Sequence, residues 1–165
     1  MSNTSRGWRQ FIEDMGDLID KHGLPHMAGR VIGALMICMP PQMSLDELAD
    51  VLQASKGSIS MTTQLLLRLG IIHRVSVPGD RKHYFQIRPK MGQELFLDRS
   101  DHIQQHLDAL RKGLDQLKDE PIEAKQRLIE MEVFFEFLQT ELPGLMRRWT
   151  EQREALLEKK LSKRR

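Results

Sequence analysis

The chain has 165 residues and a formal net charge of +2, and 40% of its residues are hydrophobic but only 5% aromatic. This length suits one domain, or one domain with an appendage, and the composition is that of a globular protein with a buried core. The longest apolar run, Val31 to Met39, is too short to cross a bilayer. Because no signal-peptide pattern opens the sequence, we expect a cytoplasmic protein with no membrane partner.

Two helices are expected before residue 40. The first has apolar residues at helical spacing, namely Trp8, Phe11, Ile12, Met15, Leu18 and Ile19. Gly23 ends this helix, and Pro25 suits the first turn of the next one, which runs to about Met39. The second helix should pack beneath the segment that follows it, through Val31, Ile32, Leu35, Met36 and Met39. Arg30 in this helix either reaches a phosphate or pairs with an acid inside the domain. The single cysteine, Cys38, excludes an internal disulfide, and we expect it to be packed rather than redox-active.

Residues 45–69 have the pattern of a helix-turn-helix. Ser44 and Glu47 form a capping box, which opens a short helix over residues 45–53. Ser55 can cap a second helix, which we expect to run to Leu69. The inward face of that second helix carries Ile59, Thr62, Leu66 and Leu69. Its opposite face carries Lys56, Gly57, Ser60, Met61, Gln64 and Arg68.

A two-stranded hairpin is expected to follow the second helix. Gly70 ends the helix, and residues 71–77 alternate weakly, as a strand does. Pro78 and Gly79 provide a turn, and residues 82–87 form the returning strand. The order helix, turn, helix, hairpin is that of a winged helix-turn-helix. In that fold the second helix enters the major groove of DNA, and the hairpin, or wing, follows the backbone or enters the minor groove.

Positive charge is concentrated in this part of the chain. Residues 55–90 contain seven basic residues and one acidic residue, although the whole chain is only +2. Such a basic segment is the expected electrostatic footprint for DNA phosphates, and the alternative is a solvated helix and hairpin that bind no nucleic acid. We expect phosphate contacts from Lys56, Arg68 and Arg74, base contacts from Ser58, Ser60, Met61 and Gln64, and wing contacts from Arg81 and Lys82.

Three segments resemble the MarR family of winged-helix transcriptional regulators. They are Ser55-Lys56-Gly57-Ser58-Ile59-Ser60, Leu69-Gly70-Ile71-Ile72-His73-Arg74 and Pro78-Gly79-Asp80-Arg81-Lys82. The segment from Gly23 to Arg30 and the Ser-Lys-Gly-Ser step at residues 55–58 are more similar to the GbsR-type branch of the family. The similarity to the family covers about residues 23–90. Lys82 replaces the second arginine of the family's Asp-Arg-Arg wing motif, and Ile87-Arg88 stands where Leu-Thr is common. Members of the GbsR-type branch include regulators that respond to choline-like compounds, so the resemblance implies a small-molecule effector such as a quaternary ammonium compound.

The remaining sequence predicts three helices. Apolar residues recur at spacings of three and four in each, at Ile103, Leu107, Leu110, Leu114 and Leu117, then Leu128, Met131, Phe135, Leu138 and Leu142, then Leu145, Trp149, Leu156 and Leu157. The breaks are expected at Asp119-Glu120-Pro121 and at Pro143-Gly144. Residues 91–141 carry twelve acids and six bases, so this half should not lie on DNA. Its apolar surface exceeds what three helices need among themselves, which favours a homodimer over a monomeric helical cap.

Other chemistry has weaker support in the sequence. His102 and His106 lie one helical turn apart, and Asp98 lies one turn before them. This arrangement can hold a metal ion, but polar residues on a solvated helix also produce it by chance. No nucleophile motif or glycine-rich phosphate loop is present, so we expect neither an enzyme nor a cofactor. A cationic effector would require an aromatic cage, but packing in the core accounts more simply for the candidate rings, which are Trp8, Phe11, Phe96, Phe134, Phe135, Phe137 and Trp149.

The sequence therefore predicts a mainly α-helical fold with a small β-hairpin wing, a winged helix-turn-helix joined to a helical dimerisation region. Its parts are an N-terminal helix for dimerisation or packing in residues 1–22, the DNA-binding domain in 23–90 and the dimerisation region in 91–165. The expected function is that of a homodimeric transcriptional repressor that binds a pseudo-palindromic operator in double-stranded DNA. The alternative is a protein-interaction module that uses the winged helix as a scaffold.

Overall fold

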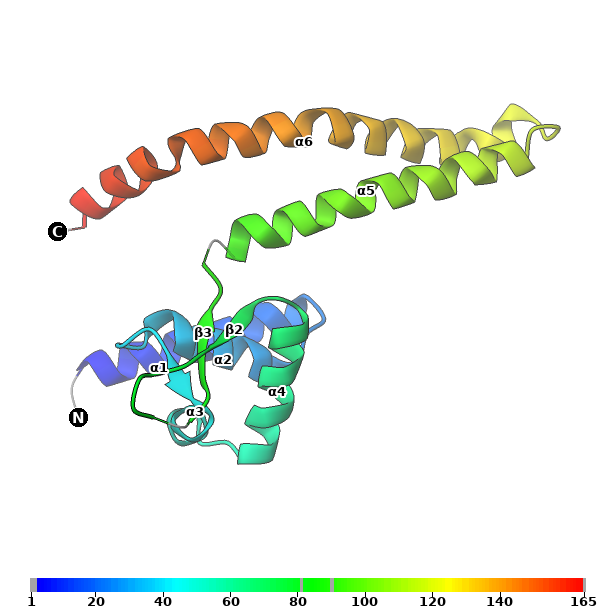
Figure 1. The fold of residues 1–165 in the computed structure, drawn as a ribbon. Coiled ribbons are helices and arrows are strands. Elements are labelled where there is room, and N and C mark those ends of the chain that lie inside the picture. The colour runs from blue at the N-terminus through cyan, green and yellow to red at the C-terminus, as the bar shows by residue number, and fades with distance from the viewer. Residues whose placement is uncertain (1–2, 81, 90, 165) are drawn as a thin grey trace. The chain divides into compact units, whose positions relative to one another are not determined.

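A computed structural model describes the backbone of residues 3–80, 82–89 and 91–164, and the side chains of these residues except 3–6 and 91–101. The chain divides into two compact units, Met1–Met91 and Gly92–Arg165. The fold is mainly α-helical with one small antiparallel sheet, as expected from the sequence (Figure 1). No helix in the described part of the chain is both long and apolar enough to cross a membrane.

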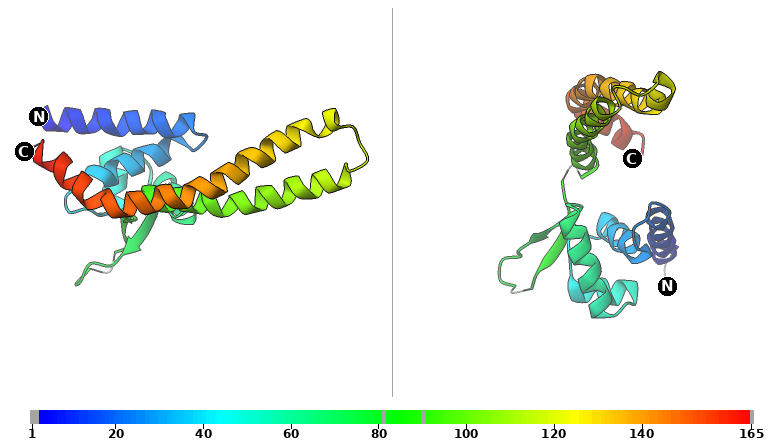
Figure 2. Two further views of the ribbon diagram at one scale, coloured as in Figure 1. Left: turned by 90° about the horizontal axis from the view of Figure 1, so that it is seen from above. Right: turned by 90° about the vertical axis from the view of Figure 1, so that its right-hand side faces the viewer.

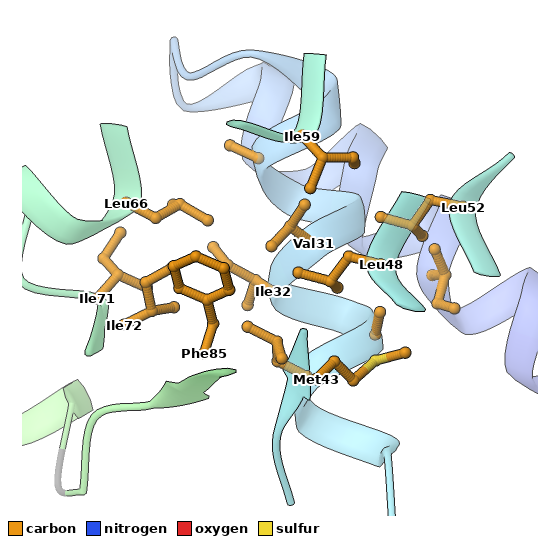
Figure 3. Packing of buried hydrophobic residues seen from close by; sticks show 14 of the residues in the cluster. Val31, Ile32, Met43, Leu48, Leu52, Ile59, Leu66, Ile71, Ile72 and Phe85 are labelled. Carbon is orange, nitrogen blue, oxygen red and sulfur yellow. The ribbon is translucent and has the colours of Figure 1, made fainter. Parts of the chain in front are cut away.

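The first unit is built around helix α2 (His26–Ile37), whose buried residues include Val31, Ile32 and Leu35. Helix α1 (Asn3–Lys21) packs along it, and helices α3 (Leu45–Leu52) and α4 (Lys56–Arg68) cover it from the other direction (Figure 2). Side chains from all these elements and from the sheet meet in one apolar core (Figure 3). The fully buried members of this core include Leu48, Leu52, Ile59, Leu66 and Ile72.

Two glycines allow α1 and α2 to approach closely. A Cβ atom on Gly29 would clash with the backbone of Met15, and one on Gly33 would come within 3.2 Å of the Ile12 Cα. Both contacts involve the backbone of α1, which cannot move aside as a flexible side chain can. The pairing of these two helices therefore depends on the absence of side chains at two positions of α2.

The capping box expected at the start of α3 is confirmed. The Ser44 N–H donates to Glu47 Oε2 at 2.7 Å, and the Glu47 N–H donates to Ser44 Oγ at 3.3 Å. Gln53 closes the helix in the left-handed conformation, at a φ of 50°. Gly70 also adopts a positive φ, of 68°, at the end of α4, as its place in the sequence predicts.

The sheet has one strand more than the sequence indicates. Strands β2 (Ile72–Val75) and β3 (Tyr84–Ile87) form the expected hairpin, and both are shorter than predicted. Strand β1 (Met43–Ser44) adds to the free side of β3, which gives the antiparallel order β1-β3-β2. A two-residue strand gives no alternating pattern, so sequence periodicity does not reveal it.

The second unit is an antiparallel pair of long helices, α5 (Met91–Gln116) and α6 (Ile122–Ser162) (Figures 1 and 2). Arg111 on α5 binds Glu132 at 3.0 Å and Glu136 at 2.7 Å, both on α6. Gln139 also donates to Gln104 across the pair at 2.7 Å. These contacts link α5 to α6 across the pair.

The predicted break at Pro143-Gly144 is wrong, because α6 continues through both residues to Ser162. A proline inside a helix removes one hydrogen bond to the carbonyl four residues earlier and tends to bend the helix. Helix α6 follows a bent course (Figure 1). Strong helix formers on either side, such as Leu142, Leu145 and Met146, allow the helix to bridge the proline at the cost of that one bond.

Candidate nucleic-acid interface

Helix α4 presents a polar face because its capping and packing fix its rotation. Ser55 Oγ accepts the Ser58 N–H at 3.2 Å and thereby starts the helix. Ile59, Thr62 and Leu66 are buried on the core side. The Thr62 hydroxyl donates to the Ser58 carbonyl at 2.8 Å, so this inward polar group is satisfied within the helix. The exposed side chains of α4, which include Lys56, Met61, Gln64 and Arg68, face outward.

The outward side chains include most of those that the sequence assigns to DNA. Lys56, Ser60, Gln64 and Arg68 recur every four residues and form one row along α4. Met61 lies beside this row with 71% of its surface exposed. Ser58 and Ser60 are both half-buried, and the other predicted contact residues of α4 are exposed.

A cleft of about 290 Å³ joins this row to the wing. Ser60 and Gln64 line it from α4, Arg74 from β2 and Lys82 from the approach to β3. Ser60 and Lys82 are 22 positions apart in the sequence, so proximity along the chain does not bring these four predicted contact residues together.

 The fold brings Ser60, Gln64, Arg74 and Lys82 together on one surface, as recognition of a continuous duplex requires. His83 also lines the cleft, and the sequence analysis did not single it out.

The turn of the wing is held by the side chain of Asp80. Its carboxylate accepts the backbone N–H of Lys82 at 2.9 Å and the hydroxyl of Tyr84 at 2.8 Å. The hydrogen bond to Asp80 raises the pKa of Tyr84 above its usual value. Asp80, which the sequence places in the turn, and Tyr84, which the sequence analysis did not identify, are therefore structural members of the wing. The predicted contact Arg81 lies outside the described residues.

Lys56 has an acidic partner that the sequence analysis also missed. Its Nζ lies 2.6 Å from the carboxylate of Asp46, in the first turn of α3. The hydrogen bond from Lys56 is the main cause that lowers the pKa of Asp46, and the positive charge of Lys82 lowers it further. Asp46 also lines the cleft between α4 and the wing, so an acid lies within the predicted DNA-binding surface.

The structure decides between the two interpretations of Arg30. Its Nε lies 3.0 Å from the Glu13 carboxylate, and its Nη2 donates to the Leu52 carbonyl at 3.0 Å. These contacts tie α1, α2 and the end of α3 together. Arg30 pairs with an acid inside the domain.

One histidine and two aromatic rings of the second unit contact one another. The His106 ring stacks on Phe135, with 4.7 Å between the ring centres, and Phe134 meets Phe135 edge-on at 5.7 Å. The side chain of Asp98, the third member of the candidate metal site, lies outside the described residues, as does that of Phe96. Among the side chains that are described, no three histidine, cysteine or acidic groups gather as a metal ion would require.

Comparison with known proteins identifies the family. The sequence pattern of the MmpR5-like MarR family transcriptional regulators matches residues 91–153. The chain is 32% identical over 142 residues to the HTH-type transcriptional regulator MmpR5 of Mycobacterium tuberculosis (strain ATCC 25618 / H37Rv), a match that covers 86% of each chain. It is also similar to a transcriptional regulator of known crystal structure, with 32% identity and a TM-score of 0.74 over 88% of this chain and 99% of the other. The resemblance drawn from the helix-turn-helix and wing motifs is thus confirmed, and the chain belongs to the MarR family of winged helix-turn-helix transcriptional regulators.

Proposed function

We propose that the protein is a cytoplasmic, homodimeric transcriptional repressor that binds a pseudo-palindromic operator. The observation that carries this proposal is the single polar surface formed by the outward row of α4, the cleft and the wing. An exposed helix face beside a basic hairpin suits a major groove and its flanking phosphates. Two such surfaces related by a two-fold axis would match two half-sites.

The surface offers different chemistry to the bases and to the backbone. Gln64 can form paired hydrogen bonds with a base edge, and the exposed Met61 can contact a thymine methyl group. Ser58 and Ser60 add short hydroxyl groups near the start of α4. Phosphate contacts are assigned to Lys56, Arg68, Arg74 and Lys82, with Arg81 as a further wing contact.

The proposal of a dimer rests on apolar surface left open in the second unit. On α6 the exposed side chains of Ile122, Val133 and Phe137 lie on one face, each about 60% exposed. Isolated exposed apolar residues are ordinary, but a row of them along one helix is characteristic of an interface. A second copy of the chain is the simplest partner for this row.

Response to an effector, and membership of the GbsR-like branch, are the finer parts of the proposal. They are supported by the similarity of the Gly23 to Arg30 segment and of the Ser-Lys-Gly-Ser step to that branch. A quaternary ammonium compound is the effector class that this similarity suggests. Calorimetric titration with choline and glycine betaine tests it, and a heat of binding that is absent for both compounds contradicts this choice of effector.

Titration of the protein against the DNA upstream of its own gene tests the main proposal. In a fluorescence anisotropy assay we expect tighter binding to this duplex than to a shuffled duplex of equal length. Equal affinity for the two duplexes would contradict recognition of an operator at that locus. No binding to either duplex would favour the alternative, in which the winged helix is a scaffold for protein contacts.

A further inference from the structure

We propose that Asp46 limits the affinity of this domain for DNA by competing with phosphate for its basic side chains. The inference rests on the proposed DNA-binding function and assigns an opposing role to one residue of the same surface. Competition predicts that loss of the Asp46 charge strengthens DNA binding, and the other roles open to an acid at this position predict different effects.

The geometry places Asp46 among the residues assigned to DNA. Its carboxylate lies 2.6 Å from Lys56 Nζ, although the two residues belong to different helices. It also lines the cleft with Ser60, Gln64, Arg74 and Lys82. Five of the assigned contact residues therefore either pair with Asp46 or share a cleft with it.

Both members of the ion pair are open to solvent and to a ligand. The side chain of Lys56 is 72% exposed and that of Asp46 is 47% exposed. An exposed pair of this kind contributes little to folding, because water solvates both charges well in its absence. The pair is therefore easily exchanged when a stronger anion arrives.

A DNA phosphate is such an anion. The exchange costs free energy that a lysine without an acidic partner would not lose. When Lys56 moves to a phosphate, Asp46 loses its partner and remains as a negative charge close to the negative backbone. An aspartate carboxylate is ionised at neutral pH with or without a basic partner, so the negative charge of Asp46 remains after Lys56 has moved. Because every duplex presents phosphates, the cost applies to operator and random DNA alike.

Three other roles for Asp46 are open to test. An acidic side chain in the first turn of a helix stabilises the helix by interacting with its dipole, and Asp46 has that position in α3. A role confined to the dipole predicts that loss of the charge lowers the melting temperature and leaves DNA affinity unchanged. A role in holding Lys56 toward DNA predicts that loss of the charge weakens binding. A role in helping Lys56 discriminate between sequences predicts a change for the operator alone.

The experiment measures the affinity of the full-length protein for a short random-sequence duplex at several salt concentrations. For Asp46→Asn we expect binding about five- to tenfold tighter than wild type at low salt. The slope of log affinity against log salt should become steeper by about one per protomer, since Lys56 then releases a condensed counterion without losing an internal partner. Asp20→Asn removes the same charge from α1, which makes it the matched control, and it should leave affinity within about twofold.

A second pair of variants links the effect to Lys56. In a Lys56→Ala background, Asp46→Asn should recover less than half of the gain that it gives alone. If Asp46→Asn folds poorly, Asp46→Ser supplies the same loss of charge with a residue that helix N-termini accept. Unchanged or weaker binding by a folded Asp46 variant overturns the inference, whereas failure of the wild type to bind any duplex overturns the proposed function as well.

Discussion

Gln64 and Arg74 line the same cleft but offer DNA different chemistry. Gln64 is neutral and presents both a donor and an acceptor, whereas Arg74 is always charged. The first can distinguish one base edge from another, and the second is attracted by any phosphate. We therefore expect Gln64 to contribute to sequence recognition and Arg74 to general affinity for DNA.

Replacement of each residue by alanine should produce opposite patterns. Gln64→Ala should lose discrimination between operator and random DNA, by about 1–3 kcal/mol, and keep the salt dependence. Arg74→Ala should weaken binding to both duplexes and reduce the salt slope by about one per protomer. Anisotropy titrations at several salt concentrations measure both quantities. A reduced slope for Gln64→Ala, or an unchanged slope for Arg74→Ala, would contradict these assignments.

The position of Arg81 at the tip of the predicted wing assigns it to general affinity for DNA, and that assignment stays a prediction.

What the sequence did not predict was the set of partners around the contact residues. Asp46 and Lys56 are ten positions apart on different helices, and no helical or strand period links them. The contact between them depends on the angle at which α3 and α4 cross, which is set by core packing and cannot be read from local spacing.

At the scale of elements, local signals were reliable where a helix begins or ends. The capping box at Ser44, the cap at Ser55 and the stop at Gly70 all lie where the sequence placed them. Two errors have different origins, one in a long-range strand pairing and the other in the residues next to a proline. The pairing of β1 with β3 provides hydrogen bonds for a segment with no strand pattern of its own, and the flanking helix formers of α6 override the local effect of Pro143.

The close contact between α1 and α2 makes a prediction about stability. Gly29→Ala should lower the free energy of unfolding of the first unit by about 1–3 kcal/mol, because the new methyl group meets the Met15 backbone. Gly7→Ala is the matched control, since nothing lies within 4 Å of its added Cβ, and it should be neutral or stabilising by up to about 1 kcal/mol. Urea denaturation followed by tryptophan fluorescence compares the two. Equal stability of the two variants would show that the helices can separate without cost.

The proline within α6 makes a second prediction at this scale. Pro143→Ala restores the backbone donor that proline lacks, so it should raise the thermal stability of the second unit. The gain should exceed that of Gly144→Ala, which adds only helix propensity at the neighbouring position, about 1 kcal/mol. Thermal denaturation followed by circular dichroism provides the comparison. A lower melting temperature for Pro143→Ala would mean that the bend of α6 is required by its packing.

For the molecule as a whole, the exposed apolar face of α6 predicts how the dimer can be disrupted. Phe137 is 61% exposed, so Phe137→Glu should leave the helices folded but place a charge in the proposed interface. Sedimentation equilibrium should then give the mass of a monomer, with helical content retained. The control Thr150→Glu adds the same charge at an exposed polar position of α6 and should remain a dimer.

A Phe137→Glu protein that still sediments as a dimer would place the interface elsewhere. The apolar stripe that the sequence predicts for residues 103–117 includes Leu110 and Leu114, and we also expect a charge at either position to dissociate the dimer. Both are half-buried on α5 in the single chain, so a charge at either position would disturb the fold together with any interface. Phe137→Glu is the sharper test, because loss of the dimer and loss of the fold give different results.

The short strand β1 determines where this protein can accept insertions and deletions. Ser44 pairs with Tyr84 in the sheet and also caps α3, so one added residue before it would break the cap or shift the strand by one position. Toward the tip of the wing the ladder ends at the pair Val75 and Tyr84, and a longer loop there would leave all the strand pairs in place. The reach of the wing over DNA can therefore change through loop length in the course of evolution, while its attachment to the helix-turn-helix remains fixed to the residue.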